Sequence, residues 1–343
     1  MCVLAGVIGD RSAAPILLEM LQKQEGLGGG FYTGIATIHE DKLYYRKVVG
    51  DVAKLRAETD AASLPGMMGI AHSRTPSGGD VEWGHPFVAC DGRMAYVAQG
   101  SRGYFDDQRV NVASFGNDLL AKGHAFRAVS DDKVGNYPVL SDGKSVHISD
   151  IMCHLIEEGY KESGDLLDAM REAYMKMPGE ICGLAVHEDE SDRIIAATIN
   201  QSIVAGLDDS GMYLASIGLA LPDAVTWRAS LPMNTAAAVT RHGMRLKPFD
   251  PSAVPVDMNC PYAEAEAMVL DALKNEPGAT FGKAAWGLTK SLWPDGALTR
   301  SAPMCYEIIE RLHRTGRIRF DTERVPGMFN EGTVPRVRMH LST

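Results

Sequence analysis

The sequence lacks any long apolar run. Val3 to Ile8, near the start, is far too short for a membrane span or the core of a signal peptide, and it has no basic flank. We therefore expect a cytoplasmic protein with no membrane partner. Excess positive charge is missing too, because 34 Lys and Arg stand against 44 Asp and Glu, which gives a net charge of −10. This balance argues against wholesale binding to nucleic acid, although a local basic patch stays compatible with it.

Cysteine is scarce and follows no metal-binding pattern. The six cysteines stand at positions 2, 90, 153, 182, 260 and 305, with no C-x-x-C pair and no short metal spacing. They indicate reduced thiols, and neither a metal nor a cofactor is expected. The 343 residues, 45% hydrophobic and 23% charged, suit one large or two modest globular domains, and nothing in them indicates disorder.

Cys2 is the strongest candidate nucleophile. A small second residue permits removal of Met1, after which the chain would begin with a cysteine that carries both a thiol and a free α-amino group. A free amine of this kind titrates near ~8 and a free thiol near ~8.5, so the amine can take up the thiol proton as the sulfur attacks a carbonyl group. The alternative is an ordinary buried small residue at the start of a strand.

Three later segments follow Cys2 in a fixed order: Gly69-Ile70-Ala71-His72-Ser73-Arg74, then Ser77-Gly78-Gly79 with His85-Pro86, then Val97-Ala98-Gln99-Gly100. Together they resemble the glutaminase domain of class II glutamine amidotransferases, in which a mature amino-terminal cysteine precedes a G-x-A-H-[ST]-R segment and an Asn-Gly pair. Ala215-Ser216 resembles the last strands of that domain. The resemblance covers roughly residues 2 to 240. It implies an α+β fold, the four-layer αββα sandwich of antiparallel sheets found in N-terminal nucleophile (Ntn) hydrolases.

The resemblance also implies roles for individual residues. Arg74 would hold the α-carboxylate of the substrate, with Ser77 and His85 completing the substrate pocket. The side-chain amide of Gln99 and the backbone N–H of Gly100 would hold the oxyanion, where one donor is worth roughly 3 kcal/mol. The substrate would be L-glutamine or a related amide. For Arg74 the alternative is an arginine held in a surface ion pair.

The chain departs from the pattern in its substrate pocket. The loop arginine of the family is missing at Gly28-Gly29, and the Trp-Ala-Thr-His of the aminosugar synthases is replaced by residues 75–78. Gln99 is one methylene longer than the expected Asn, and Ile148 stands where an aspartate would bind the substrate amino group. The candidate replacements for that aspartate are Asp142, Asp150 and His147. These departures keep open a different amide, such as a γ-glutamyl compound, or a binding or regulatory protein that no longer turns over substrate.

Hydrophobic periodicity predicts mixed secondary structure. Residues 33–39 and 43–49 alternate as in a β-hairpin, residues 14–22 and 149–159 have helical spacing, and residues 123–126 begin another strand. Four short β-runs between 181 and 216 indicate antiparallel sheet rather than βαβ units.

The chain is expected to divide into an Ntn domain at 2–243, a proline-rich linker at 244–261 and a winged-helix-like domain at 262–343. The last part predicts helices at 262–274, 283–292 and 301–314, then strands at 316–320 and 334–339. Acidic residues alternate with its arginines, which favours packing or dimerisation over contact with phosphates. The sequence carries no synthase or nucleotide-binding motif, so an ammonia acceptor is expected on another chain, and a homo-oligomer is compatible with it.

Overall fold

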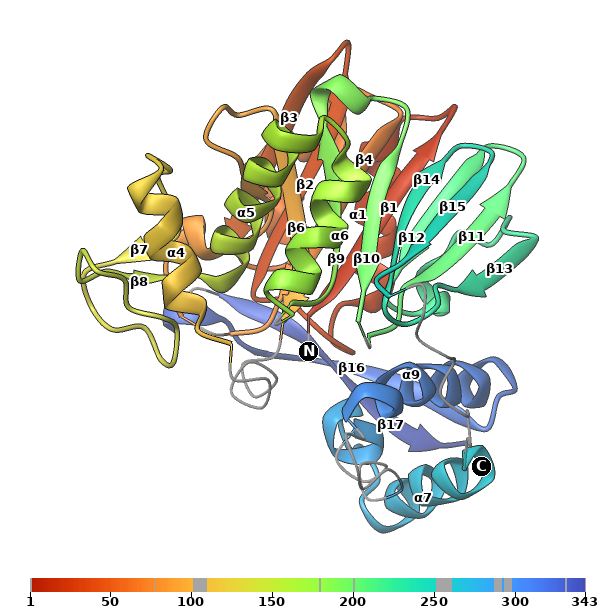
Figure 1. Cartoon of the computed structure of the whole chain (residues 1–343). Coiled ribbons are helices and arrows are strands. Elements are labelled where there is room, and N and C mark those ends of the chain that lie inside the picture. The colour runs from red at the N-terminus through yellow and green to blue at the C-terminus, as the bar shows by residue number, and fades with distance from the viewer. Residues whose placement is uncertain are drawn as a thin grey trace.

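Two antiparallel sheets lie face to face between layers of helices (Figure 1). The structure is a computed structural model that describes residues 2–76, 78–100, 110–178, 180–199, 201–250, 261–286, 292, 298–330 and 332–342. The first sheet has the strand order β13-β11-β12-β1-β4-β2-β3. Its strands are β1 (Val3–Gly9), β2 (Tyr32–His39), β3 (Lys42–Val49), β4 (Met68–Arg74), β11 (Val204–Asp208), β12 (Gly211–Ala215) and β13 (Trp227–Ser230).

The second sheet has the order β15-β14-β10-β9-β6-β5. Its strands are β5 (Phe87–Val88), β6 (Met94–Gly100), β9 (Glu180–His187), β10 (Ile194–Thr198), β14 (Thr235–Thr240) and β15 (Gly243–Pro248). Two small hairpins stand outside the sheets, β7 (Val129–Ser130) with β8 (Ser145–Val146), and β16 (Ile318–Pro326) with β17 (Thr333–Leu341).

The longer helices are α1 (Ala13–Gln24), α2 (Val52–Glu58), α4 (Val112–Ala121), α5 (Ile148–Ser163), α6 (Leu166–Lys176), α7 (Tyr262–Asn275) and α9 (Leu298–Arg314). The short helical segments are η1 (Ala61–Ser63), η2 (Val81–Trp83), η3 (Glu188–Glu190), η4 (Gly218–Ala220), η5 (Gly282–Trp286) and η7 (Met328–Asn330). None of the described helices is long and apolar enough to cross a membrane.

Alternation along the strands produces the layers. In β1, Val3, Ala5 and Val7 pack on the side of α1, whereas Leu4 and Ile8 pack between the two sheets. In β6 the residues Ala95 and Val97 face that same interior, and their neighbours face α5 and α6. Both faces of each sheet are therefore buried, as a four-layer sandwich requires. The α+β fold with antiparallel sheets is as predicted from the sequence.

The carboxy-terminal segment shares an apolar cluster with α1 and contacts the sandwich through η4 and the loop at residues 26–30. Val269 of α7 and Ile308 of α9 belong to the same apolar cluster as Leu17 of α1. The β16–β17 hairpin extends from these helices along the side of the sandwich at which β1 begins (Figure 1).

Two predictions made from the sequence are corrected. Met244 to Pro248, which were assigned to the linker, pair with β14 as most of β15, and residues 251–260 lie outside the described part of the chain. Residues 123–126, predicted as a strand, form no regular element, and β7 begins only at Val129. The polar segment around them satisfies its backbone through turns, as in the bond from the His124 N–H to the Leu119 carbonyl at 3.0 Å.

Candidate functional site

Cys2 stands immediately before β1, at the centre of the first sheet. Val3 is paired with Ser73 of β4, so the cysteine lies beside the end of the strand that carries Arg74. The Cys2 thiol is partly exposed, and its Sγ lies 3.7 Å from the Thr75 hydroxyl. Thr75 occupies the position of the tryptophan that the aminosugar synthases have after this arginine. The register of β1 on β4 thus brings together two residues that are more than seventy positions apart.

A tyrosine from the carboxy-terminal segment reaches the same place. Tyr306 of α9 is 3% exposed, and its hydroxyl accepts a hydrogen bond of 3.1 Å from the Gln201 amide. Burial raises the pKa of Tyr306, and the nearby thiols of Cys182 and Cys2 raise it further. The hydroxyl is therefore protonated at neutral pH. Nothing in the sequence around Tyr306 indicates this neighbour.

The glycine-rich loop at residues 26–30 lies against the end of β4. Gly29 has φ +71°, and a Cβ atom at this position would lie 2.7 Å from the Ser73 Oγ. The Gly30 N–H donates to that same oxygen at 2.7 Å. The loop position at which the family carries an arginine therefore has no room for a side chain on this side.

A buried carboxylate lies under this loop. Glu25 accepts hydrogen bonds from the hydroxyls of Ser73 and Thr33 at 3.1 and 3.2 Å and from the Val52 N–H at 3.0 Å. Burial raises the pKa of Glu25 to about 7, and the charge of Asp51 adds to the effect. The group therefore titrates close to neutrality beside the end of β4.

The β16–β17 hairpin covers the outer side of the glycine-rich loop. The Val337 N–H donates to the Gly26 carbonyl at 3.0 Å, and Pro335 is the nearest neighbour of Gly30 on that side. Arg324 forms an ion pair of 2.7 Å with Asp51, which caps α2. The wall on this side of the Cys2 region is thus built from both halves of the chain.

Arg74 is almost fully enclosed. Its guanidinium donates to the Trp83 carbonyl at 2.8 Å and to the Tyr137 hydroxyl at 2.9 Å, and it lies 4.7 Å from the centre of the Tyr32 ring. Only 2% of the residue is exposed. It is a buried cation within a cage of acceptors and one aromatic face, not a surface arginine in an ion pair.

The Tyr137 oxygen is shared by two donors. His147 accepts from the Ser149 N–H through Nδ1 at 3.1 Å, so in its neutral form the proton resides on Nε2. This Nε2–H lies 3.2 Å from the Tyr137 oxygen, which also accepts from Arg74. Burial and the positive charge of Arg74 lower the pKa of His147 well below its usual value, which keeps the ring neutral.

Gln99 points toward β1 through Ser216. Its amide Nε2 donates to the Ser216 hydroxyl at 2.7 Å, and the Leu4 N–H donates to the same oxygen at 2.9 Å. Gln99 is 3% exposed, and the register with β9 shifts between Gln99 and Gly100. The end of β6 is therefore irregular at the place where Gln99 carries a side chain one methylene longer than the expected Asn.

His85 lies in a cluster of aromatic rings. Its ring is 3.9 Å from that of His72, 4.6 Å from that of Phe87 and 5.7 Å from that of His147. Burial lowers the pKa of His85 well below its usual value, and the neighbouring cationic groups lower it further. Neither ring nitrogen has a hydrogen-bond partner among the described residues. Ser77, the other predicted pocket residue, lies outside them.

The candidates for the missing aspartate are separated by the structure. Ile148 is buried at the first position of α5, and Asp142 lies on an exposed turn. Asp150 accepts from the N–H groups of Arg127 and Ala128 at 2.8 Å each, away from Arg74. Of the three candidate replacements, Asp142, Asp150 and His147, only His147 is connected to Arg74, through the Tyr137 hydroxyl.

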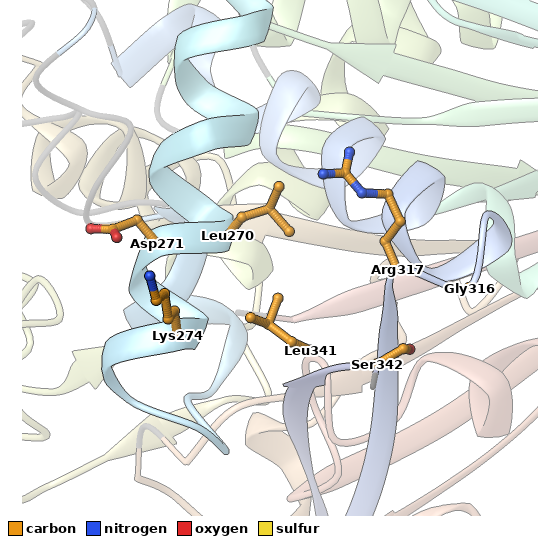
Figure 2. A pocket seen from close by; sticks show the side chains of 7 residues that line it. All are labelled: Leu270, Asp271, Lys274, Gly316, Arg317, Leu341 and Ser342. Carbon is orange, nitrogen blue, oxygen red and sulfur yellow. The ribbon is translucent and has the colours of Figure 1, made fainter.

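A hollow of about 540 Å³ lies elsewhere, between α7 and the ends of the β16–β17 hairpin (Figure 2). Its lining residues carry charges of both signs and belong to the carboxy-terminal segment alone: Leu270, Asp271, Lys274, Gly316, Arg317, Leu341 and Ser342. It shares no lining residue with the region around Cys2.

Comparison with known proteins finds relatives over about two thirds to four fifths of the chain. The glutamine–fructose-6-phosphate aminotransferase of Corynebacterium glutamicum is 30% identical over 281 residues, 78% of this chain and 41% of the relative. The enzyme of Thermus thermophilus is 29% identical over 272 residues, which are 77% of this chain and 40% of the relative. The enzyme of Pyrococcus horikoshii is 27% identical over 219 residues, which are 63% of this chain and 32% of the relative. The chain thus spans about a third to two fifths of these relatives. No protein-family model matches it.

Solved structures agree in fold. The glutamine phosphoribosylpyrophosphate amidotransferase from B. subtilis superposes with a TM-score of 0.59 at 17% identity, covering 93% of this chain and 66% of the other. An allosteric regulatory enzyme of purine biosynthesis superposes with a TM-score of 0.55 at 19% identity, covering 74% of this chain and 50% of the other. The predicted resemblance of the amino-terminal sandwich to the glutaminase domain of class II glutamine amidotransferases is confirmed.

Proposed function

We propose that the chain is the glutaminase part of a glutamine amidotransferase, with Cys2 as its nucleophile after removal of Met1. The observation that carries the proposal is the pairing of β1 with β4, which sets a partly exposed thiol beside the strand end that holds a buried arginine. The relatives are named glutamine–fructose-6-phosphate aminotransferases, which supports glutamine as the substrate proposed here.

The chemistry needs one residue to act twice. The Cys2 sulfur attacks the side-chain amide carbon while the α-amine takes the thiol proton, and the same amine returns a proton to the departing ammonia. A thioester remains on the sulfur. Water then attacks this thioester carbon with the amine as base, which releases glutamate and restores the thiol. In this scheme Gln99 and Gly100 supply the donors for the oxyanion.

The donors around Tyr137 support recognition of a carboxylate. Arg74 and the Nε2–H of His147 converge on one oxygen, which here belongs to the tyrosine. A substrate carboxylate that replaced this hydroxyl would meet a cation and a neutral donor already in position. We assign the substrate α-carboxylate to this place, with His85 as part of the pocket behind it.

A related amide is the second candidate. The apolar Ile148 and the crowded Gly29 remove two groups that the family uses on glutamine, and Asp150 is occupied elsewhere. A γ-glutamyl compound has the same reacting carbonyl group and needs a different set of pocket contacts. The nucleophile and its mechanism would be unchanged.

We place the ammonia acceptor on a separate synthase chain. The described residues after the sandwich form helices and one hairpin that share an apolar cluster with α1, with no further α/β unit among them. We also propose that 262–343 is a winged-helix-like domain that serves packing, with the domain division of the chain at the segment before Tyr262. Its described arginines are largely neutralised within the chain, since Arg317 pairs with Glu266, Arg314 with Glu310 and Arg319 with Asp321.

A covalent probe tests the proposal. Intact mass should show loss of Met1, and a diazoketone or chloroketone analogue of glutamine should label the peptide that begins with Cys2 and block release of glutamate. Peptide mapping is needed because Cys90 is also exposed, whereas the other described cysteines are buried. Label at Cys90 alone, or activity with Met1 retained, contradicts the mechanism. A γ-glutamyl amide that is turned over in place of glutamine selects the second candidate, and no turnover of either amide indicates a binding protein.

A further inference from the structure

A second cysteine lies at the centre of an unrelated cluster. Cys90 is in the turn between β5 and β6, His124 follows α4, and His154 and Glu157 are one helical turn apart on α5. The two histidines and the glutamate are at most 6% exposed, and Cys90 closes the cluster at the surface. None of these residues has a part in the chemistry proposed for Cys2.

The ligand atoms converge on one point. The Cys90 Sγ lies 3.5 Å from the His154 Nδ1 and 3.7 Å from the His124 Nδ1, and the two nitrogens are 3.4 Å apart. The Glu157 Oε2 lies 2.9 Å from the first nitrogen and 3.3 Å from the second. All four atoms are within 4.8 Å of one another. A tetrahedral zinc ion bound to sulfur, nitrogen and oxygen holds its ligand atoms roughly 3.3 to 3.6 Å apart.

Hydrogen bonds would satisfy these four atoms only in pairs. One proton on a histidine Nδ1 serves one acceptor, whereas here both Nδ1 atoms face each other, a sulfur and a carboxylate oxygen. A divalent cation at the common point would be contacted by all four atoms at once. A thiolate and a carboxylate together also balance its charge.

A carboxylate lies beside the Nε2 atom of each imidazole, on the side away from the cluster. The His124 Nε2 lies 3.0 Å from Glu158, and the His154 Nε2 faces Asp150 at 3.4 Å. A proton on each Nε2 leaves the Nδ1 lone pair free for a metal. Glu158 is itself bound by Lys122 at 2.7 Å, and Asp150 is held by two backbone N–H groups. The segment after α4 adds an N–H contact from Ala125 to the Cys90 sulfur at 3.4 Å.

We propose that Cys90, His124, His154 and Glu157 form a structural zinc site. Four protein ligands close a tetrahedral site and leave no position for a substrate or a reactive water. The ion would fasten the β5–β6 turn and the segment after α4 to the middle of α5. That helix also presents His147 at its amino-terminal end, so zinc would brace the helix that the Arg74 group contacts.

Metal content and cobalt spectroscopy of the full chain test the site. Protein purified without added chelator should contain one zinc per chain, and cobalt reconstitution should give tetrahedral d–d absorption with a thiolate-to-cobalt charge-transfer band. Cys90→Ser should remove that band and weaken zinc binding at least tenfold. His154→Gln should weaken zinc binding without removing the thiol.

Cys153→Ala is the matched control, because it removes a thiol next to His154 on α5 that is not in the cluster. It should keep both the zinc and the charge-transfer band. Protein that binds neither zinc nor cobalt, or a Cys90→Ser variant with an unchanged band, overturns the proposal. Both readouts are independent of amide hydrolysis, so this site and the function proposed for Cys2 succeed or fail separately.

Discussion

The Cys2 region and the Cys90 cluster each contain a cysteine sulfur, but the two sulfurs have different surroundings. The Cys2 sulfur is partly exposed and lies 3.7 Å from the Thr75 hydroxyl, so a substrate can reach it. The Cys90 sulfur lies against two imidazoles in a cluster closed by a carboxylate. A thiol becomes a nucleophile where its surroundings leave it free, and a ligand where they converge on it.

The largest expected effect separates the two cysteines by chemistry. Cys2→Ala should lower glutamate release at least about a thousandfold, because no other group can form the thioester. The same variant should keep its zinc and the cobalt charge-transfer band. The measurement is a glutaminase assay beside metal analysis of one preparation. Retained activity would show that the nucleophile lies elsewhere, and lost metal would show that the two regions are not independent.

The buried acid near Cys2 should make stability depend on pH. Glu25 has its pKa raised to about 7 from 4.5, so the folded state holds a proton that the unfolded state has released over this interval. Its contribution to the free energy of unfolding is therefore full below about pH 4.5 and is lost as the pH rises through about 7. Between pH 5 and pH 8 the loss amounts to about 2 to 3 kcal/mol.

Glu25→Gln should remove this dependence. Urea unfolding at pH 5 and pH 8 gives the free energy of unfolding of both proteins. The difference in this free energy between wild type and variant should change by about 2 to 3 kcal/mol between the two pH values. Glu19→Gln, on the exposed face of α1, the helix that ends just before Glu25, is the control and should follow wild type. Equal pH dependence in wild type and Glu25→Gln would mean that the carboxyl group titrates in its ordinary range.

The positions of several candidate residues around Cys2 could be predicted from the sequence because these residues stand at the ends of strands. Arg74 is the last residue of β4 and Gln99 the penultimate residue of β6, and a strand determines both the spacing and the direction of its residues. The hairpin at 33–49 and the helices α1 and α5 were predicted for the same reason, a regular hydrophobic period. The strand at 123–126 was wrong because a short apolar run has no period to distinguish strand from turn.

The Cys90 cluster could not be found in this way. Its residues come from a turn, an irregular segment and a helix, and only the three-residue separation of His154 and Glu157 is a recognisable metal-binding interval. Tyr306 was missed for a similar reason, since the docking of α9 on the sandwich depends on packing rather than on a local motif. The sequence left three candidates for the residue that replaces the missing aspartate. Only tertiary contacts connect one of them, His147, with Arg74.

Arg74 tests whether the region around Tyr137 recognises a carboxylate. Arg74→Lys keeps the charge but loses the planar set of donors, so it should raise KM for glutamine about tenfold, equivalent to ~1.4 kcal/mol, with a smaller effect on kcat. Steady-state kinetics over a range of glutamine concentrations measure this. Lys47→Arg, a change at another cation near His85, is the control. An unchanged KM would remove Arg74 from the pocket and leave it a purely structural cation.

The smallest expected effect tests whether the Cys2 region extends into the carboxy-terminal segment, as the Cys90 cluster does not. Tyr306→Phe leaves the Gln201 amide without its partner in a site where both residues are nearly fully buried, so the free energy of unfolding should fall by about 1 kcal/mol. Tyr160→Phe, on the partly exposed side of α5, should cost less. If α9 helps to form the wall beside the nucleophile, Tyr306→Phe should also change the rate at which the glutamine analogue labels Cys2, whereas Tyr160→Phe should not. A change in stability with identical labelling rates would confine the role of Tyr306 to packing.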